Sequence, residues 1–164
     1  MPPSSAEAAP SLHFLDTNVV IYAMGHSPNA PASTRELEDA SRRIIAEIGN
    51  DRIRAVSSLV VLQEIVHLMT RWARQERGPE LPNVRSVAAS VIALCDAVYT
   101  PTLTEFNQAL DEYSHHGRLD FNDHLIVQCM RSNEVAYILT ADRGFQILAD
   151  VEAIDPVQLI RNQG

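Results

Sequence analysis

Four acidic residues lie within or beside apolar segments that are spread along the whole chain: Asp16, Glu64, Asp123 and Asp142. Asp16 follows the apolar residues 12–15, and Asp142 follows the largely apolar segment 136–141. Ionised carboxylates are rarely buried without a partner, so acids in such places are expected to have a cation or hydrogen-bond donors nearby. If the fold gathers the four side chains, their natural partner is a hard divalent metal, and the natural chemistry is hydrolysis of a phosphoester.

Strands and helices alternate in the secondary structure that the sequence predicts. Short apolar segments predict strands at residues 11–16, 53–56, 97–100, 136–140 and 151–154. Helical periodicity predicts helices over residues 19–24, 33 or 34 to 50, 57 or 58 to about 75, 84–93, 103–113 and 122–132, with a short one at 144–148. Thr17 and Asn18 are the predicted caps of the first helix. Residues 78–82 are predicted to end the third helix.

This alternation predicts an α/β fold, a three-layer α/β/α sandwich around a central, mainly parallel sheet. Ligands of such sheets bind outside the carboxyl ends of the strands, where Asp16 and Asp142 are predicted to lie. Glu64 is placed two turns into the helix after the second strand, and Asp123 in the first turn of its helix, so all four acids can converge at one edge. The chain has 164 residues, enough for one domain with a proper core. We expect residues 1–10 to be a disordered lead-in and residues 11–164 to form that domain.

The composition is that of a globular protein, with 46% hydrophobic and 21% charged residues. No apolar segment approaches the roughly 18 residues of a membrane span, and the start lacks the basic and apolar regions of a secretory signal. Cys95 and Cys129 have neither metal nor redox spacing, which favours free thiols in a reducing cytoplasm. The net charge of −8 argues against extensive contact with nucleic acid. Four of the negative charges would belong to the metal site, and any RNA contact would be local.

The segments that carry the four acids together resemble the PIN-domain family and, within it, the VapC-type toxin ribonucleases of bacterial type II toxin–antitoxin pairs. The resemblance covers roughly residues 12–155. It rests on Phe14-Leu15-Asp16-Thr17-Asn18, on Ser58 with Glu64 six residues later, on Asn122-Asp123-His124-Leu125-Ile126, and on Leu139-Thr140-Ala141-Asp142-Arg143-Gly144-Phe145. Each motif alone is weak, but four of them in this order and in matching strand and helix contexts are specific.

The resemblance implies a PIN-like fold, a Mg²⁺ site that Mn²⁺ could also fill, an RNA substrate and a cognate antitoxin. Asp16, Glu64, Asp123 and Asp142 match the family's first to fourth metal-ligating acids in that order. Asn18 and Thr140 match polar positions that orient ligands or substrate. The family commonly has Asp-Ala and then small residues at the third motif, whereas this chain has Asp123-His124 and then Gln128-Cys129-Met130, which makes the surface near the site bulkier. A homodimer is expected for a small fold with apolar helices.

Other polar residues have weaker functional interpretations. Asp120 is either the N-cap of the helix that carries Asp123 or an additional ligand, and the cap is favoured. Arg118 and Arg143 lie close to the acids in sequence and are predicted to contact substrate. His67 and His124 could also touch substrate, but a structural role is favoured for both. A further stripe of arginines could meet RNA phosphates or form a solvated face: Arg71, Arg74 and Arg77.

Each of the four acids also has a simpler local role. Asp16 could stabilise a helix N-terminus through the helix dipole, and Asp142 could be a turn residue. Asp123 could complete a capping box with Asp120, and Glu64 could be a solvated helix residue. The functional interpretation is favoured for all four, because all four occur together in one order.

The sequence therefore predicts a metal-dependent endoribonuclease that acts as a toxin. In the expected mechanism a metal lowers the pKa of a water, and the hydroxide attacks phosphorus and displaces the 3′ oxygen, leaving a 5′-phosphate and a 3′-hydroxyl. One alternative is a non-catalytic PIN-like module that binds RNA or protein, which would not need four mutually repelling acids. Another is a phosphohydrolase of small phosphates, but no glycine-rich phosphate loop follows Asp16.

Overall fold

Five parallel strands form the central sheet of the computed structural model, which describes residues 11–25, 29–75, 81–115 and 118–162. Their order across the sheet is β3-β2-β1-β4-β5. The strands are β1 Leu12–Leu15, β2 Arg54–Ser58, β3 Ala97–Tyr99, β4 Tyr137–Leu139 and β5 Glu152–Ile154. The predicted lead-in at residues 1–10 and Arg77 lie outside the described residues. The predicted α/β fold with a parallel sheet is confirmed.

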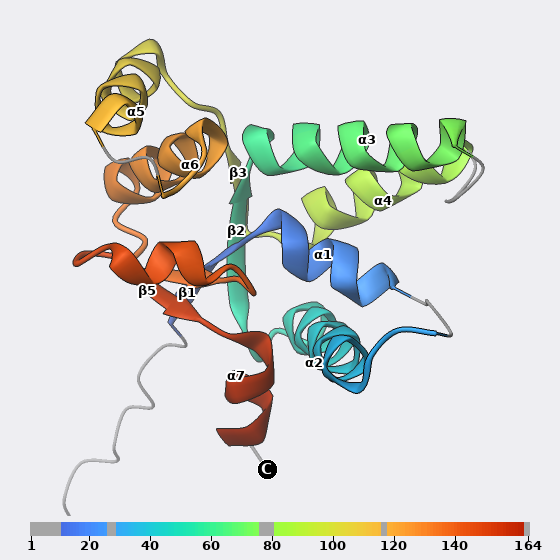
Figure 1. The fold of residues 1–164 in the computed structure, drawn as a ribbon. Helices are drawn as coiled ribbons and strands as arrows, with labels where there is room; N and C mark the ends of the chain where they lie inside the picture. The colour runs from blue at the N-terminus through green and yellow to red at the C-terminus, as the bar shows by residue number, and fades with distance from the viewer. Residues whose placement is uncertain (1–10, 26–28, 76–80, 116–117, 163–164) are drawn as a thin grey trace, which may run out of the picture.

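Helices cover both faces of this sheet (Figure 1). They are α1 Thr17–Met24, α2 Ala32–Gly49, α3 Leu59–Arg74, α4 Leu81–Leu94, α5 Leu103–His115, α6 Phe121–Ser132, the 3-10 helix η1 Arg143–Ile147, and α7 Pro156–Asn162. The connections from β1 to β2 and from β2 to β3 step across the sheet in one direction, and the connection from β3 to β4 returns in the other. Because such crossovers are right-handed, α1–α4 lie on one face and α5 and α6 on the opposite face.

The core lies where the helices meet the sheet. Phe14 and Leu15 of β1 and Ile138 of β4 are completely buried. Ile65 of α3 and Ile126 of α6 are completely buried as well, and they come from helices on opposite faces. Strands covered on both sides are largely apolar, which explains why β1 and β4 are mainly apolar without a strict alternation.

The structure corrects some of the predicted element boundaries. Asp16 is the N-cap of α1, and its side chain accepts a hydrogen bond from the Thr17 backbone, so Thr17 already belongs to the helix. Helix α2 begins at Ala32 after Pro31, without a side-chain cap, and α4 begins at Leu81 inside the predicted break. Proline is compatible with the first turn of a helix because no hydrogen bond of the helix needs its missing N–H there.

The C-terminal helix α7 was not predicted. Asp155 accepts hydrogen bonds from the backbones of Val157 and Gln158 at 2.8 and 3.2 Å, and Pro156 is the first helical residue. This is a usual helix start, and the Asp-Pro pair in the sequence was its only local signal. Helix α7 packs against α2, and Arg161 pairs there with Glu36.

The strand order creates a switch point at the centre of the sheet. β1 has β2 on one side and β4 on the other, and the order of strands reverses direction between β1 and β4. A crevice is expected outside the carboxyl ends of strands at such a point. Asp16 follows β1 there, and Thr140 follows β4. Within the described part of the chain, no helix combines the length and apolar character that crossing a membrane requires.

Candidate active site

Asp16 is the most deeply buried of the four acids, with only 4% of its surface exposed. One carboxylate oxygen accepts a hydrogen bond from the Thr17 backbone N–H at 2.7 Å. The other accepts from Asn18 Nδ2 at 2.5 Å and from Thr140 Oγ1 at 2.7 Å. The end of β1, the first turn of α1 and the end of β4 therefore fix this carboxylate together.

Asn18 and Thr140 connect Asp16 to the loop that carries Asp142. The Asn18 side chain donates to Thr140 Oγ1 at 2.9 Å and accepts from the Ala141 backbone N–H at 2.9 Å. Thr140 Oγ1 also accepts from the Asp142 backbone N–H at 3.0 Å. Both residues were predicted to orient ligands or substrate, and the contacts that they make in this structure orient the backbone and side chains of the site.

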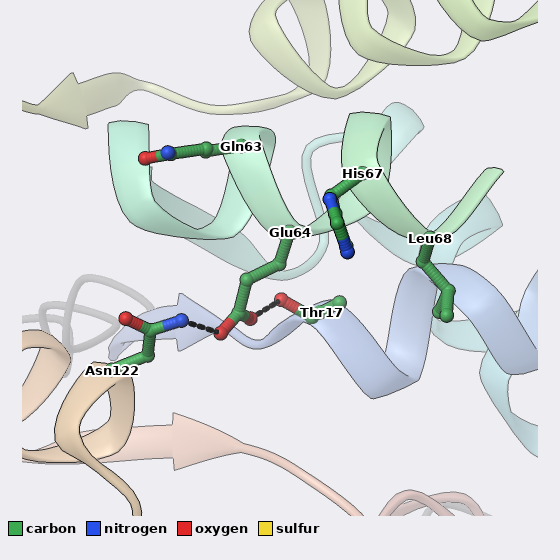
Figure 2. A pocket seen from close by; sticks show the side chains of 6 residues that line it. All are labelled: Thr17, Gln63, Glu64, His67, Leu68 and Asn122. Carbon is green, nitrogen blue, oxygen red and sulfur yellow. Dashed lines mark hydrogen bonds between the residues drawn. The ribbon is translucent and has the colours of Figure 1, made fainter. Parts of the chain in front are cut away.

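Glu64 projects from the second turn of α3 and is held at both oxygens (Figure 2). Thr17 Oγ1 donates to Oε2 at 2.5 Å, and Asn122 Nδ2 donates to Oε1 at 2.7 Å. These donors come from the N-terminal turns of α1 and α6, so three helices meet at this carboxylate. The rotational phase of α3, which the sequence left open, points Glu64 toward the site.

Asp123 has both the local role and the placement that the sequence suggested. Asp120 caps α6 and accepts from the Asp123 backbone at 2.9 Å, while Asp123 accepts from the Asp120 backbone at 3.1 Å. The capping box that the sequence offered as the simpler role of Asp123 is therefore present, and Asp120 is its cap, as the sequence favoured. Asp142 similarly caps η1 and accepts from the Gly144 backbone at 2.7 Å.

The acids are close enough to repel one another. Burial raises the pKa of Asp16 to about 6, and the charges of Glu64 and Asp142 add to the rise against the lowering effect of its hydrogen bonds to Thr140 and Thr17. Burial and the charge of Asp120 raise the pKa of Asp123 to about 7. Asp16 and Asp142 add further to that rise. A shared electrostatic field thus links acids that lie as far apart in sequence as Asp16 and Asp142.

These carboxylates offer the ligand chemistry of a hard divalent cation. Oxygen donors from several carboxylates are what Mg²⁺ and Mn²⁺ prefer, and a cation would relieve the repulsion that raises the two pKa values. Within the described residues, no three His, Cys, Asp or Glu side chains are already gathered to hold a metal ion. The physical reason is visible at two of the acids, because Glu64 is turned to Thr17 and Asn122, and Asp123 is turned to the backbone of Asp120.

A cavity of about 450 Å³ adjoins Glu64. The described residues that line it are Thr17, Gln63, Glu64, His67, Leu68 and Asn122 (Figure 2). His67 thus shares a cavity with Glu64, although a structural role was favoured for it. Arg118 and Arg143 are exposed and do not belong to this lining. Arg71 and Arg74 lie exposed in the last turn of α3.

His124 has the structural setting that the sequence favoured. It is 2% exposed, lies 3.5 Å from Glu112, and stacks edge-on with Tyr113 at a ring-centroid distance of 6.1 Å. The sequence placed Thr17 and Asn122 in the motifs but did not identify them as donors to Glu64. Their only sequence signal was their position beside the acids Asp16 and Asp123.

Comparison with known protein families shows which family the chain belongs to. A sequence profile of the PIN domain matches residues 13–151, which is most of the chain and includes all four acids. The chain belongs to the PIN-domain family. The resemblance that the four motifs predicted is therefore confirmed.

This PIN domain is similar to a ribonuclease, VapC7 of Mycobacterium tuberculosis, with 26% identity over 143 residues. That alignment covers 87% of this chain and 90% of the relative. Its fold is similar to that of M. tuberculosis VapC20, a toxin that cleaves the sarcin-ricin loop, with a TM-score of 0.59, 18% identity, and coverage of 87% of this chain and 98% of the other. It is also similar to VapBC-1 from nontypeable Haemophilus influenzae, with a TM-score of 0.58, 20% identity, and coverage of 88% and 98%.

Proposed function

We propose that this PIN domain is a metal-dependent endoribonuclease that hydrolyses RNA phosphodiester bonds and serves as the toxin of a toxin–antitoxin pair. The observation that carries the proposal is the buried and electrostatically unfavourable environment of Asp16. It is buried at the switch point of the sheet, held by three donors, and repelled by Glu64 and Asp142. The similarity to a ribonuclease over most of both chains supports RNA as the substrate.

The four acids would hold Mg²⁺, with Mn²⁺ as a possible substitute: Asp16, Glu64, Asp123 and Asp142. The chemistry that a bound divalent cation supplies is polarisation of the phosphate and a hydroxide nucleophile at neutral pH. Asp16 is already fixed by its hydrogen bonds and contributes a preformed anchor. Glu64 and Asp123 would exchange bonds to neighbouring donors for ligation, and Thr17 and Asn122 set the position from which Glu64 moves.

Substrate would reach this edge of the sheet from the exposed side of the acids. Arg118 and Arg143 lie exposed near the third and fourth acids in sequence and are proposed to contact RNA phosphates. With a net charge of −8, the protein would bind RNA through a few such local contacts. Hydrolysis is proposed to leave a 5′-phosphate and a 3′-hydroxyl.

A non-catalytic binding module explains less of the structure. Helix capping alone accounts for Asp142 and Asp123, because each satisfies backbone N–H groups where it stands. It does not account for Glu64, which lies inside α3 and is aimed at the same edge of the sheet as Asp16. A scaffold would gain nothing from burying Asp16 against two other charges.

The proposed partners follow from the toxin role. A cognate antitoxin would keep the nuclease inactive, the active form would be a homodimer, and the activity is proposed to lie in the cytoplasm. Residues 11–164 are proposed to act as one domain. An antitoxin encoded beside this chain should form a complex with it on co-expression and suppress its RNA cleavage.

The test is cleavage of a panel of structured RNAs with Mg²⁺ or Mn²⁺ by the native chain and by Asp16→Asn. We expect the native chain to cut, chelation of the metal to stop it, and the variant to lose at least about 100-fold in rate, as for removal of a group acting in the transition state. Asp51→Asn is the matched control. Asp51 is exposed on the turn before β2, away from the site, and asparagine readily adopts its φ of 58°.

Circular dichroism shows whether Asp16→Asn folds, and Glu64→Gln replaces it if it does not. The products should carry 5′-phosphate and 3′-hydroxyl ends. The proposal is contradicted if the native chain cuts no RNA in the panel, or if the folded site variant cuts as fast as the native chain.

A further inference from the structure

The cavity beside Glu64 extends the site beyond the four acids. Its volume of about 450 Å³ lies within the range of roughly 300–1,000 Å³ that small-ligand pockets occupy. Glu64 and His67 project into it from one side of α3, and Thr17 and Asn122 face them from the first turns of α1 and α6 (Figure 2). The cavity therefore opens directly onto an acid of the proposed metal site.

The lining has the chemistry that recognises a flat, polar-edged ring. Gln63 carries both a hydrogen-bond donor and an acceptor on one amide, and His67 offers an exposed imidazole face. Leu68, which is half-buried, supplies an apolar surface next to them. The Asn122 amide donates to Glu64, and its oxygen points away from that bond (Figure 2). Unpaired RNA bases are bound by this combination of stacking on a ring and hydrogen bonding at the base edge.

The same lining is unsuited to a phosphate or a cationic side chain. None of the described lining residues is an arginine, and a phosphate would meet the carboxylate of Glu64 instead. A guanidinium would need that carboxylate as its partner. Both Glu64 oxygens already accept hydrogen bonds, from Thr17 at 2.5 Å and from Asn122 at 2.7 Å, and a guanidinium that displaced these donors would compete with the metal proposed for Glu64.

We infer that this cavity is a base-binding subsite that receives one unpaired nucleobase of the RNA next to the bond that is cut. Gln63 reads the edge of the base, and His67 stacks on its face. The inference rests on the proposed ribonuclease function and adds a source of sequence preference to it. Because Glu64 lines the cavity and belongs to the proposed metal site, the bound base lies next to the scissile phosphate.

The first experiment sequences the ends of products that the full chain forms from a pool of single-stranded RNAs with randomised sequence. Native protein, Gln63→Ala and His67→Ala are compared. The matched controls are Gln158→Ala on α7 and His115→Ala at the end of α5, both exposed residues outside the cavity lining. We expect a base preference at one fixed position beside the cut. Each cavity variant should weaken it about tenfold, as for loss of one edge or stacking contact, and the controls should keep it.

The second experiment needs no cleavage. The ring C–H resonances of His67, assigned by comparison with His67→Ala, are followed by NMR in metal-free protein during titration with the four nucleoside 5′-monophosphates and with ribose 5-phosphate. We expect shifts that differ from base to base and no comparable shift with ribose 5-phosphate. Equal shifts with the sugar phosphate would overturn the subsite.

The outcomes separate this inference from the proposed function. If the native chain cuts RNA but both cavity variants keep its base preference, the subsite is wrong and the nuclease function stands. If those variants only weaken inhibition by the antitoxin, the cavity belongs to the antitoxin, which also overturns the inference. If the native chain cuts no RNA while the bases shift the His67 resonances selectively, the cavity is a base-binding site, and its place beside a scissile bond falls with the nuclease function.

Discussion

In the metal-free protein, the contribution of Asp16 to the free energy of unfolding should decrease as the pH rises from about 5 to about 8. Its pKa is raised from 3.8 to about 6 in the folded state, so the folded chain holds this proton more tightly than the unfolded chain does. The resulting stability is fully present below the unfolded pKa and is lost as the pH rises through the folded pKa. The pKa of Asp123, raised to about 7, acts in the same direction.

The size of the effect follows from the shift. At about 1.4 kcal/mol for each unit of pKa, the rise of Asp16 from 3.8 to about 6 corresponds to about 3 kcal/mol of unfolding free energy. About half of this is lost between about pH 5 and about pH 8, because part of the proton release occurs below pH 5. The Asp123 contribution does not add in full, since the two shifts share the repulsion between the two carboxylates.

Urea unfolding in the presence of a chelator, followed by circular dichroism, measures this free energy at a series of pH values. The comparison with Asp16→Asn isolates the residue, because other groups titrate in both proteins. His13 has a lowered pKa, which by itself makes stability rise with pH through the same region. The unfolding free energy of the native chain minus that of Asp16→Asn should therefore fall by about 1–2 kcal/mol between about pH 5 and about pH 8.

Added Mg²⁺ should raise the unfolding free energy of the native chain more at about pH 8 than at about pH 5, because protonated carboxylates bind a cation poorly. A difference between native and Asp16→Asn that stays constant or rises across this range would refute the reasoning. It would mean that Asp16 is not held in a repulsive, buried environment in the metal-free protein.

Two further substitutions test contacts around the acids. Thr17→Val removes the hydroxyl that donates to Glu64 at 2.5 Å. Because a hydrogen bond to a charged group contributes about 1.5–3 kcal/mol, initial rates of RNA cleavage should drop about tenfold or more. Thr17→Ser should stay near the native rate, and equal losses in both variants would argue against the hydroxyl. Gly144→Ala would place a Cβ 2.9 Å from Leu119 and 3.1 Å from the Asp142 carboxylate. Thermal unfolding should show a loss of about 1–3 kcal/mol in the free energy of unfolding. An unchanged melting temperature would contradict this close approach.

Local sequence patterns predicted most of the strands and helices. The apolar segments of β1 and β4, Ser58 at the start of α3 and Asp120 at the start of α6 are read from neighbours a few residues apart. The main miss was α7, whose Asp155-Pro156 start was too short a signal. The start of α2 was predicted at residue 33 or 34 and lies at Ala32, because Pro31 precedes the helix without a side-chain cap that the sequence could indicate.

The acids of the site and two polar residues beside them, Asn18 and Thr140, could be found from the sequence, whereas the contacts between these side chains could not. Thr17 lies 47 residues from Glu64, Asn122 lies 58 residues from it, and Thr140 lies 124 residues from Asp16. Whether such side chains meet depends on the rotational phase of α3 and on the placement of β4 beside β1. Neither is encoded in a short window of sequence.

The sequence by itself determined the order of elements, the four acids and the family, because caps, periodicity and motifs are local features. The tertiary structure decided that β1 and β4 are neighbours at a switch point, that Glu64 is held between two helix N-termini, and that His67 shares its cavity. The physical reason is that burial, repulsion and hydrogen bonding across the sheet arise only when distant segments are packed together. Those same long-range contacts raise the pKa values of Asp16 and Asp123.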